Sequence, residues 1–312
     1  MSNILEVKNV SKAYDSFIAL DDVSISIPEG AVFGLLGPNG AGKTSLIRII
    51  NQITAPDSGE VLFGKEKLNP SHTARIGYLP EERGLYKKME VGEQALYLAQ
   101  LKGLSRPEAL KRLKVWFEKF EIKGWWKKKV EELSKGMQQK VQFIVTVVHE
   151  PTLLILDEPF TGFDPINANL IKDELLEMKA NGVTIALSTH RMESVEELCT
   201  HIALINKSKK LLDGSVKDIR SSFRQNLYEI EYEGSNISLA NSLWGDFELI
   251  SNEPSGDWMK ASIRLHNNGK TNDLLQGLIN NLTIHSFREV LPNMNDIFIQ
   301  SVTQKESSTP HA

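Results

Sequence analysis

GPNGAGKT, residues Gly37–Thr44, decides the fold class of this chain. The stretch fits the pattern G-x-x-x-x-G-K-[ST], and it lies between the apolar segment 31–36 and a helical pattern that begins at Lys43. Glycines let successive backbone N–H groups point into one concavity, and the following helix adds the positive end of its dipole. The stretch therefore predicts a loop that binds the phosphates of a nucleotide.

The residues of this phosphate loop divide into side-chain and backbone contributors. Lys43 brings a cation near the β- and γ-phosphates, and the Thr44 hydroxyl is suited to ligating Mg²⁺. The other members offer mainly main-chain groups. The predicted ATP-binding set at this loop is Gly37, Pro38, Asn39, Gly40, Ala41, Gly42, Lys43, Thr44 and Ser45.

A second motif, LLILDEP at residues 153–159, brings two carboxylates to the end of a predicted strand. In open α/β sheets, ligands bind at the carboxyl ends of the strands. We expect Asp157 to hold Mg²⁺ and Glu158 to polarise the attacking water. A strand that merely ends in polar residues is the plain alternative, and the phosphate loop in the same chain makes it the weaker one.

The pattern of the first two thirds of the chain predicts an α/β fold with a parallel sheet. A β-α-β pattern, in which the segment 168–180 is helical, favours parallel strands. The region of about 85–150 is helical and predicts a helical insert. The strands expected from apolar pattern cover residues 3–10, 22–27, 31–36, 75–79, 152–156, 183–187 and 201–205.

The residue pattern of the sequence changes near residue 225. In LYEIEYE, residues 227–233, aromatic and aliphatic side chains alternate with glutamates, which predicts a half-buried strand. The order of elements from there is βαββαβ plus a closing helix, the order of a ferredoxin-like unit. We expect an ATPase domain over 1–225, an α+β accessory domain over 226–305 and a flexible tail over 306–312.

Composition and charge limit the function classes. The chain has 312 residues, of which 36 are Lys or Arg and 40 are Asp or Glu, so its net charge is −4. That balance of acidic and basic residues is not typical of a protein that coats nucleic acid. One cysteine, no secretory signal and no long apolar run predict a cytoplasmic protein. If it works at a membrane, another chain spans the bilayer.

A third motif, Leu133-Ser134-Lys135-Gly136-Met137, lies a short distance before the paired carboxylates. With this signature segment, residues 3–220 resemble the nucleotide-binding subunit of an ATP-binding cassette (ABC) transporter. The resemblance implies a P-loop NTPase cassette that hydrolyses ATP with Mg²⁺. It also implies site roles: Tyr14 stacks on adenine, Asp164 communicates between subunits, His190 contacts the γ-phosphate, and Ser134, Lys135 and Gly136 contact the nucleotide of a second copy.

Two residues depart from the family pattern. Glu81 stands where most members carry glutamine, and a carboxylate there ligates Mg²⁺ more strongly but repels phosphate. Lys135 replaces a glycine, and two interpretations stay open: a cation that reaches the γ-phosphate across the interface, or a solvated lysine. Both departures resemble the bacterial type-2 exporter ATPases, which include sodium-efflux subunits of the NatA kind.

The resemblance implies a function and its partners. We expect an ATPase that drives export through a separate membrane-spanning permease, as one of two copies arranged head to tail at the inner face of the cell membrane. The alternative is a soluble ABC ATPase that acts on ribosomes or nucleic acid. Such proteins usually carry two cassettes, long coiled coils or zinc-binding cysteines, whereas this chain has one phosphate loop and one cysteine.

Overall fold

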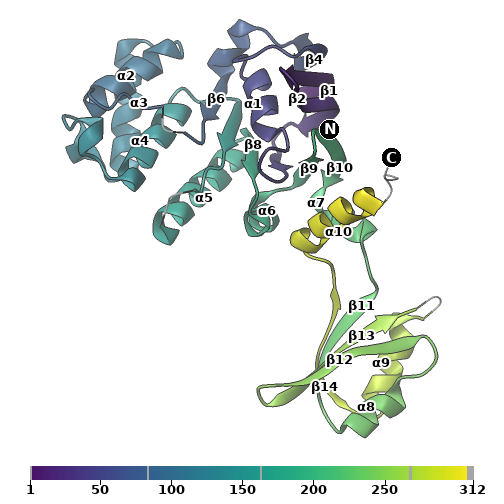
Figure 1. Ribbon diagram of the computed structural model, residues 1–312. Coiled ribbons are helices and arrows are strands. Elements are labelled where there is room, and N and C mark those ends of the chain that lie inside the picture. The colour runs from purple at the N-terminus through teal and green to yellow at the C-terminus, as the bar shows by residue number, and fades with distance from the viewer. Residues whose placement is uncertain (1, 83, 162–163, 267–268, 308–312) are drawn as a thin grey trace. The chain divides into compact units, whose positions relative to one another are not determined.

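The chain forms two compact units, residues 1–216 with 301–312, and residues 217–300. The computed structural model describes residues 2–82, 84–161, 164–266 and 269–307, and Figure 1 labels their elements. Each unit has a hydrophobic core of its own. In the described part of the chain, no helix combines the length and the apolar character needed to cross a membrane.

A six-stranded sheet forms the centre of the first unit. Its strand order is β10-β9-β3-β8-β7-β6, and β6, β7, β8, β3 and β9 run parallel while β10 is antiparallel to β9. The fold is therefore α/β, as the sequence predicts. The strands are β3 (Val32–Leu36), β6 (Ile76–Leu79), β7 (Leu153–Asp157), β8 (Thr184–Thr189), β9 (His201–Asn206) and β10 (Lys209–Ser215).

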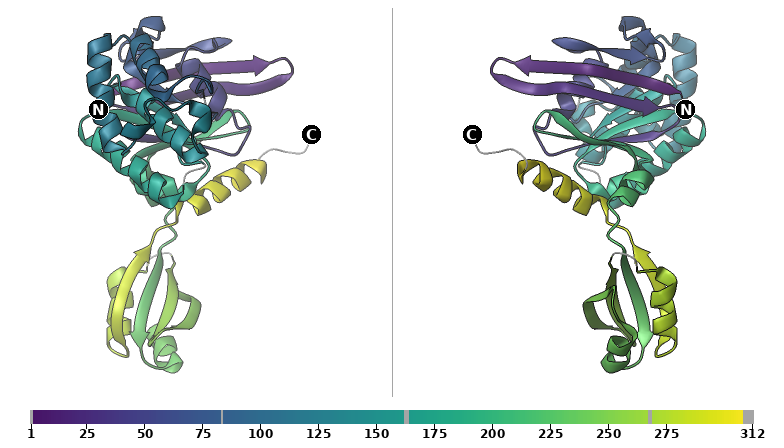
Figure 2. Two further views of the ribbon diagram at one scale, coloured as in Figure 1. Left: turned by 90° about the vertical axis from the view of Figure 1, so that its left-hand side faces the viewer. Right: turned by 90° about the vertical axis from the view of Figure 1, so that its right-hand side faces the viewer.

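A second sheet, antiparallel and of order β2-β1-β4-β5, carries the long hairpin drawn in purple in Figure 2. Its strands are β1 (Asn3–Tyr14), β2 (Phe17–Pro28), β4 (Ser58–Phe63) and β5 (Glu66–Lys67). The hairpin is longer than the predicted strands 3–10 and 22–27. Register shifts interrupt the pairing, and Asn9 and Asp22 have φ angles of 50° and 52°. Such irregularities break the alternation on which a strand prediction depends.

The helices of the first unit follow the prediction closely. Helix α1 begins at Lys43, directly after the phosphate loop, and α2, α3 and α4 form the predicted insert beside the β6 edge of the sheet (Figure 1). The bounds are α1 (Lys43–Ile50), α2 (Val91–Leu101), α3 (Arg106–Lys119), α4 (Lys135–Val147), α5 (Pro165–Ala180) and α6 (Met192–Leu198), with short 3₁₀ turns at Pro70–Arg75, Lys123–Trp125 and Val130–Glu132. Helix α7 (Val216–Ser222) follows at the division between the units, and its residues 217–222 belong to the second unit.

The second unit has the predicted ferredoxin-like topology. Its antiparallel sheet has the order β12-β13-β11-β14, and helices α8 and α9 cover one face of that sheet (Figure 2). Ile230 and Tyr232, both fully buried, pack beneath these helices. The elements are β11 (Leu227–Glu233), α8 (Asn236–Ser242), β12 (Phe247–Ser255), β13 (Trp258–Leu265), α9 (Thr271–Ile279), β14 (Thr283–Val290) and α10 (Met294–Ser307), of which α10 crosses the division at residue 300.

The division between the units differs from the predicted boundaries at 225 and 305. Residues 217–226 belong with the second unit because two arginines fasten them there. Arg220 Nε donates to Pro292 O at 3.1 Å, and Arg224 forms an ion pair with Glu289 at 2.7 Å. At the other end, α10 continues to Ser307, so residues 306 and 307 are helical rather than a tail, and residues 308–312 lie outside the described part.

The separate cores predict two unfolding transitions. Ile230→Ala removes a fully buried side chain from the core of the second unit and should cost that unit ~2–5 kcal/mol of stability. Urea denaturation followed by circular dichroism should show only one transition shifting, and saturating ATP should shift only the other. A single transition that responds to both changes would contradict independent units.

Candidate functional site

A pocket of about 340 Å³ lies at the carboxyl ends of the parallel strands. Strands β3 and β7 both end there, so the phosphate loop and the paired carboxylates converge although more than a hundred residues separate them in sequence. The residues that line it are Phe17, Asn39, Gly40, Gly42, Lys43, Thr44, Ser45, Glu81, Asp157 and Glu158. Six of the nine residues of the predicted phosphate loop set therefore surround one cavity, together with Glu81 and the paired carboxylates.

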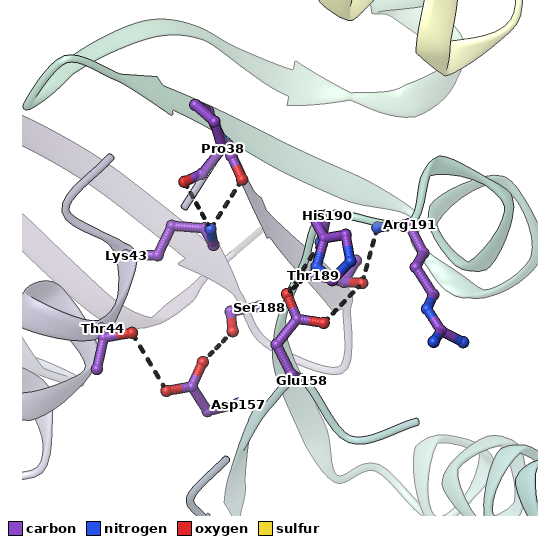
Figure 3. Close-up of polar contacts among 10 residues, drawn as sticks. Pro38, Lys43, Thr44, Asp157, Glu158, Ser188, Thr189, His190 and Arg191 are labelled. Atoms are coloured by element: carbon purple, nitrogen blue, oxygen red, sulfur yellow. Dashed lines mark hydrogen bonds and ion pairs between the residues drawn. The ribbon is translucent and has the colours of Figure 1, made fainter. Parts of the chain in front are cut away.

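Lys43 is the cation of this pocket. Its side chain is nearly buried, and Nζ donates hydrogen bonds to Gly37 O at 2.8 Å and Pro38 O at 3.0 Å, as Figure 3 shows. Burial lowers the pKa of the ammonium group, and the nearby carboxylates, Glu158 foremost, act in the opposite direction. The loop carbonyls thus hold the ammonium group beside the space where phosphate oxygens would lie.

Asp157 ends strand β7 as a buried carboxylate. One of its oxygens accepts a hydrogen bond from the Ser188 hydroxyl, and the other lies 3.5 Å from the Thr44 hydroxyl. Burial raises the pKa of Asp157, and the Ser188 hydrogen bond works against that shift. The arrangement joins strand β8, strand β7 and the start of α1 at a single carboxyl group.

Glu158 is held by the loop that follows strand β8. Its Oε1 accepts from both the backbone N–H of His190, at 3.1 Å, and His190 Nδ1, at 2.7 Å (Figure 3). Thr189 Oγ1 lies 3.5 Å from the other oxygen. The backbone of Glu158 has a φ angle of 49°, in the left-handed region that non-glycine residues rarely adopt. Strain of this kind persists where neighbouring structure enforces a functional conformation.

Two aromatic residues flank the turn of the β1–β2 hairpin, and the structure distinguishes them. Phe17 lines the pocket and is 55% exposed. Tyr14, the predicted adenine platform, does not line it, and Lys12 Nζ lies over its ring at 5.5 Å. The stacking role of Tyr14 stays a prediction. No role was predicted for Phe17 from the sequence. Its position beside a tight turn, where a large aromatic side chain is often exposed, is the signal that could have identified it.

The signature segment lies away from the pocket of its own chain. Ser134 caps helix α4 by accepting a hydrogen bond from Met137 N at 3.3 Å, and both Ser134 and Lys135 are exposed. None of Ser134, Lys135 and Gly136 lines the pocket. Asp164 caps α5 through a hydrogen bond from Asn167 N at 3.0 Å. These residues are free to meet another molecule.

Two hydroxyl residues complete the site and were not predicted to have a role. Ser188 and Thr189 form the last two positions of strand β8, where each reaches a carboxylate of the neighbouring motif. Both side chains are almost completely buried. A polar pair at the end of an otherwise apolar strand is the sequence signal that could have identified them.

The donor set of the pocket fits a hard divalent cation that is shared with a nucleotide. Thr44 and Asp157 present hydroxyl and carboxylate oxygens, and Glu81 adds a further carboxylate. Among the described residues, no three His, Cys, Asp or Glu side chains gather into a metal site. Mg²⁺ is typically bound by one or two carboxylates together with substrate phosphates and water. The side chains present therefore fit Mg²⁺ bound with ATP better than Mg²⁺ alone.

Family models match both units of the chain. The model described as ABC transporter matches residues 20–161, and the model of the C-terminal domain of DrrA1-3-like ATP-binding proteins matches residues 214–302. The second match extends the likeness beyond the cassette, over the ferredoxin-like unit.

Individual relatives agree with these matches. The uncharacterized ABC transporter ATP-binding protein YhaQ of Bacillus subtilis is 40% identical over 299 residues, which are 96% of this chain and 98% of YhaQ. The Nod factor export ATP-binding protein I of Cupriavidus metallidurans is 33% identical over 225 residues, 71% of this chain and 74% of that protein. A solved ATP-binding subunit of an ABC transporter has a TM-score of 0.66 and 32% identity, and the match covers 70% of this chain and 93% of that one. The chain therefore belongs to the family of ABC transporter ATP-binding proteins, whose cassettes hydrolyse ATP.

Proposed function

We propose that this ATPase works as a head-to-tail pair of copies and drives export through a membrane-spanning permease formed by another chain. Export is the activity named for the Nod factor relative. The observation that carries the proposal is the split between the two halves of the site. The phosphate loop and carboxylates share one pocket, while the exposed signature segment lies apart from it.

Each site residue then has a distinct part in hydrolysis. The phosphate loop and Lys43 bind the polyphosphate, and Glu158 accepts a hydrogen bond from the attacking water and orients it. His190 and Thr189 keep the Glu158 carboxylate in place. We assign Mg²⁺ to Thr44, Asp157 and Glu81, where it would neutralise charge on the phosphate oxygens.

The second copy supplies the remaining contacts. Ser134, Lys135 and Gly136 lie at the N-terminus of α4, where backbone N–H groups and the helix dipole favour an anion. Facing the pocket of the other copy, they would contact its nucleotide, and Lys135 would add a cation. Nucleotide binding and dimerisation are then linked, because each makes the other more favourable. The position of the pair is the inner face of the membrane, against the permease.

Glu158→Gln separates binding from hydrolysis. The amide keeps the shape of the side chain but loses the charge that polarises water, so turnover should fall about a hundredfold or more. ATP binding should persist, and sedimentation velocity with ATP should show a stable dimer. Glu193→Gln, an exposed site on α6 outside the pocket, is the matched control and should keep the parental rate. Parental turnover in Glu158→Gln would remove this residue from the mechanism.

Lys135→Ala tests the contact across the dimer. Lys135 is exposed and does not line the pocket of its own chain. ATP-induced dimerisation and turnover should both fall, by about tenfold for the loss of one charge-assisted contact, while the affinity of the monomer for ATP stays unchanged. Lys128→Ala, an exposed lysine before the signature segment, serves as the control. An equal fall in monomer affinity would show that Lys135 acts within one chain.

A further inference from the structure

Helix α4 and the turn that follows it carry a row of buried polar side chains on one side. Gln142, Thr146 and His149 follow the helical spacing i, i+4, i+7, and each is less than a tenth exposed. Burial of polar groups is costly unless they find hydrogen-bond partners. Their partners therefore show what this face of the helix does.

For Gln142 and His149, the partners are backbone carbonyls in strand β6 or just beyond it. Among the described strands, β6 is an edge strand that pairs only with β7, so no described strand bonds its outer carbonyls. Side chains of α4 and of the turn after it lie against these carbonyls: Gln142 Nε2 donates to Glu82 O at 3.3 Å, and His149 Nε2 donates to Ile76 O at 3.3 Å. The Thr146 hydroxyl donates to Gln142 O of its own helix at 2.8 Å, and its Oγ1 lies 3.5 Å from Tyr78 O.

Close approach of the helix to the strand depends on Gly77. A Cβ atom at that position would lie 2.7 Å from Thr146 O, too near for any ordinary contact. The strand and the helix are thus fitted to each other, and α4 acts as a polar cover for the open edge of the sheet.

Gln142 differs from the other two because its acceptor lies beyond the strand. Ile76 and Tyr78 belong to β6, which β7 already holds in place. Glu82 follows the strand and neighbours Glu81, which lines the nucleotide pocket. Near the start of the same helix, Gln139 Nε2 donates to Thr161 O, three residues beyond Glu158. Gln142 and Gln139 of α4 therefore hold the two segments that carry two pocket carboxylates. These carboxylates are Glu81 and Glu158, respectively.

We propose that Gln142 is a positioning residue, which ties the segment that carries Glu81 to helix α4. The signature segment starts that helix, roughly 10 Å from Gln142 along its axis. Through this hydrogen bond, the carboxylate at one nucleotide and the contacts to the nucleotide of the other copy move as one body. The inference rests on the roles proposed above for Glu81 and for residues 134–136.

Gln142→Met tests the inference, because methionine keeps the length of the side chain and removes the donor. Steady-state kinetics should show kcat lowered about tenfold and KM for ATP changed less than about twofold. Hydrogen–deuterium exchange should become faster around Glu82 and stay unchanged over residues 37–44. Gln142→Asn, too short to reach Glu82, is the second variant if methionine impairs folding. Thr146→Val, on the same face of α4, should keep kcat within about twofold.

A double variant separates this inference from the role of Glu81. If Gln142 acts through Glu81, adding Gln142→Met to Glu81→Gln should lower kcat no further. Additive losses, a parental kcat in Gln142→Met or unaltered exchange around Glu82 would each overturn the inference. If Glu81→Gln alone keeps the parental kcat, the proposed role of Glu81 falls, and the exchange rates alone decide whether Gln142 holds the segment.

Discussion

The site depends on the interactions that the ammonium group of Lys43 makes. It lies between the carbonyls of its own loop and the carboxylates that end strand β7. A buried cation alone would be costly, and so would two neighbouring carboxylates without one. The cation and the carboxylates stabilise each other. The pocket beside them favours a ligand that carries both negative and positive charge. A polyphosphate bound with a divalent cation supplies both, which is why the resting geometry suits MgATP.

The parallel sheet brings these groups together, and this part of the fold could be predicted from sequence. Each motif combines an apolar strand with polar residues at its end, so both the strand and the side on which its functional group lies are encoded locally. The same holds for the second unit, where LYEIEYE and the order of elements predicted the observed ferredoxin-like topology. The β1–β2 hairpin was underestimated because residues such as Asn9 and Asp22 interrupt its alternation.

The sequence could not show which of two chemically similar side chains lies at the site. Tyr14 and Phe17 are both aromatic and both flank one turn, and only three-dimensional placement puts Phe17 at the pocket. In the sequence Gln142 is one polar residue of an amphipathic helix, and its proposed role depends on a backbone carbonyl, Glu82 O, that lies 60 residues away in sequence. The pairing of His190 with Glu158 also depends on neighbouring strands. Such contacts are non-local, so no pattern within one segment encodes them.

The most direct test of this account is the affinity of the Lys43→Met protein for MgATP, measured by isothermal titration calorimetry. Methionine retains an unbranched side chain but no charge, so the carboxylates of the pocket face the phosphates unopposed. Affinity should fall about a hundredfold, consistent with loss of a buried charge contact of roughly 3 kcal/mol, while circular dichroism stays unchanged. A dissociation constant within about threefold of the parental value would contradict the central role given to this ammonium group.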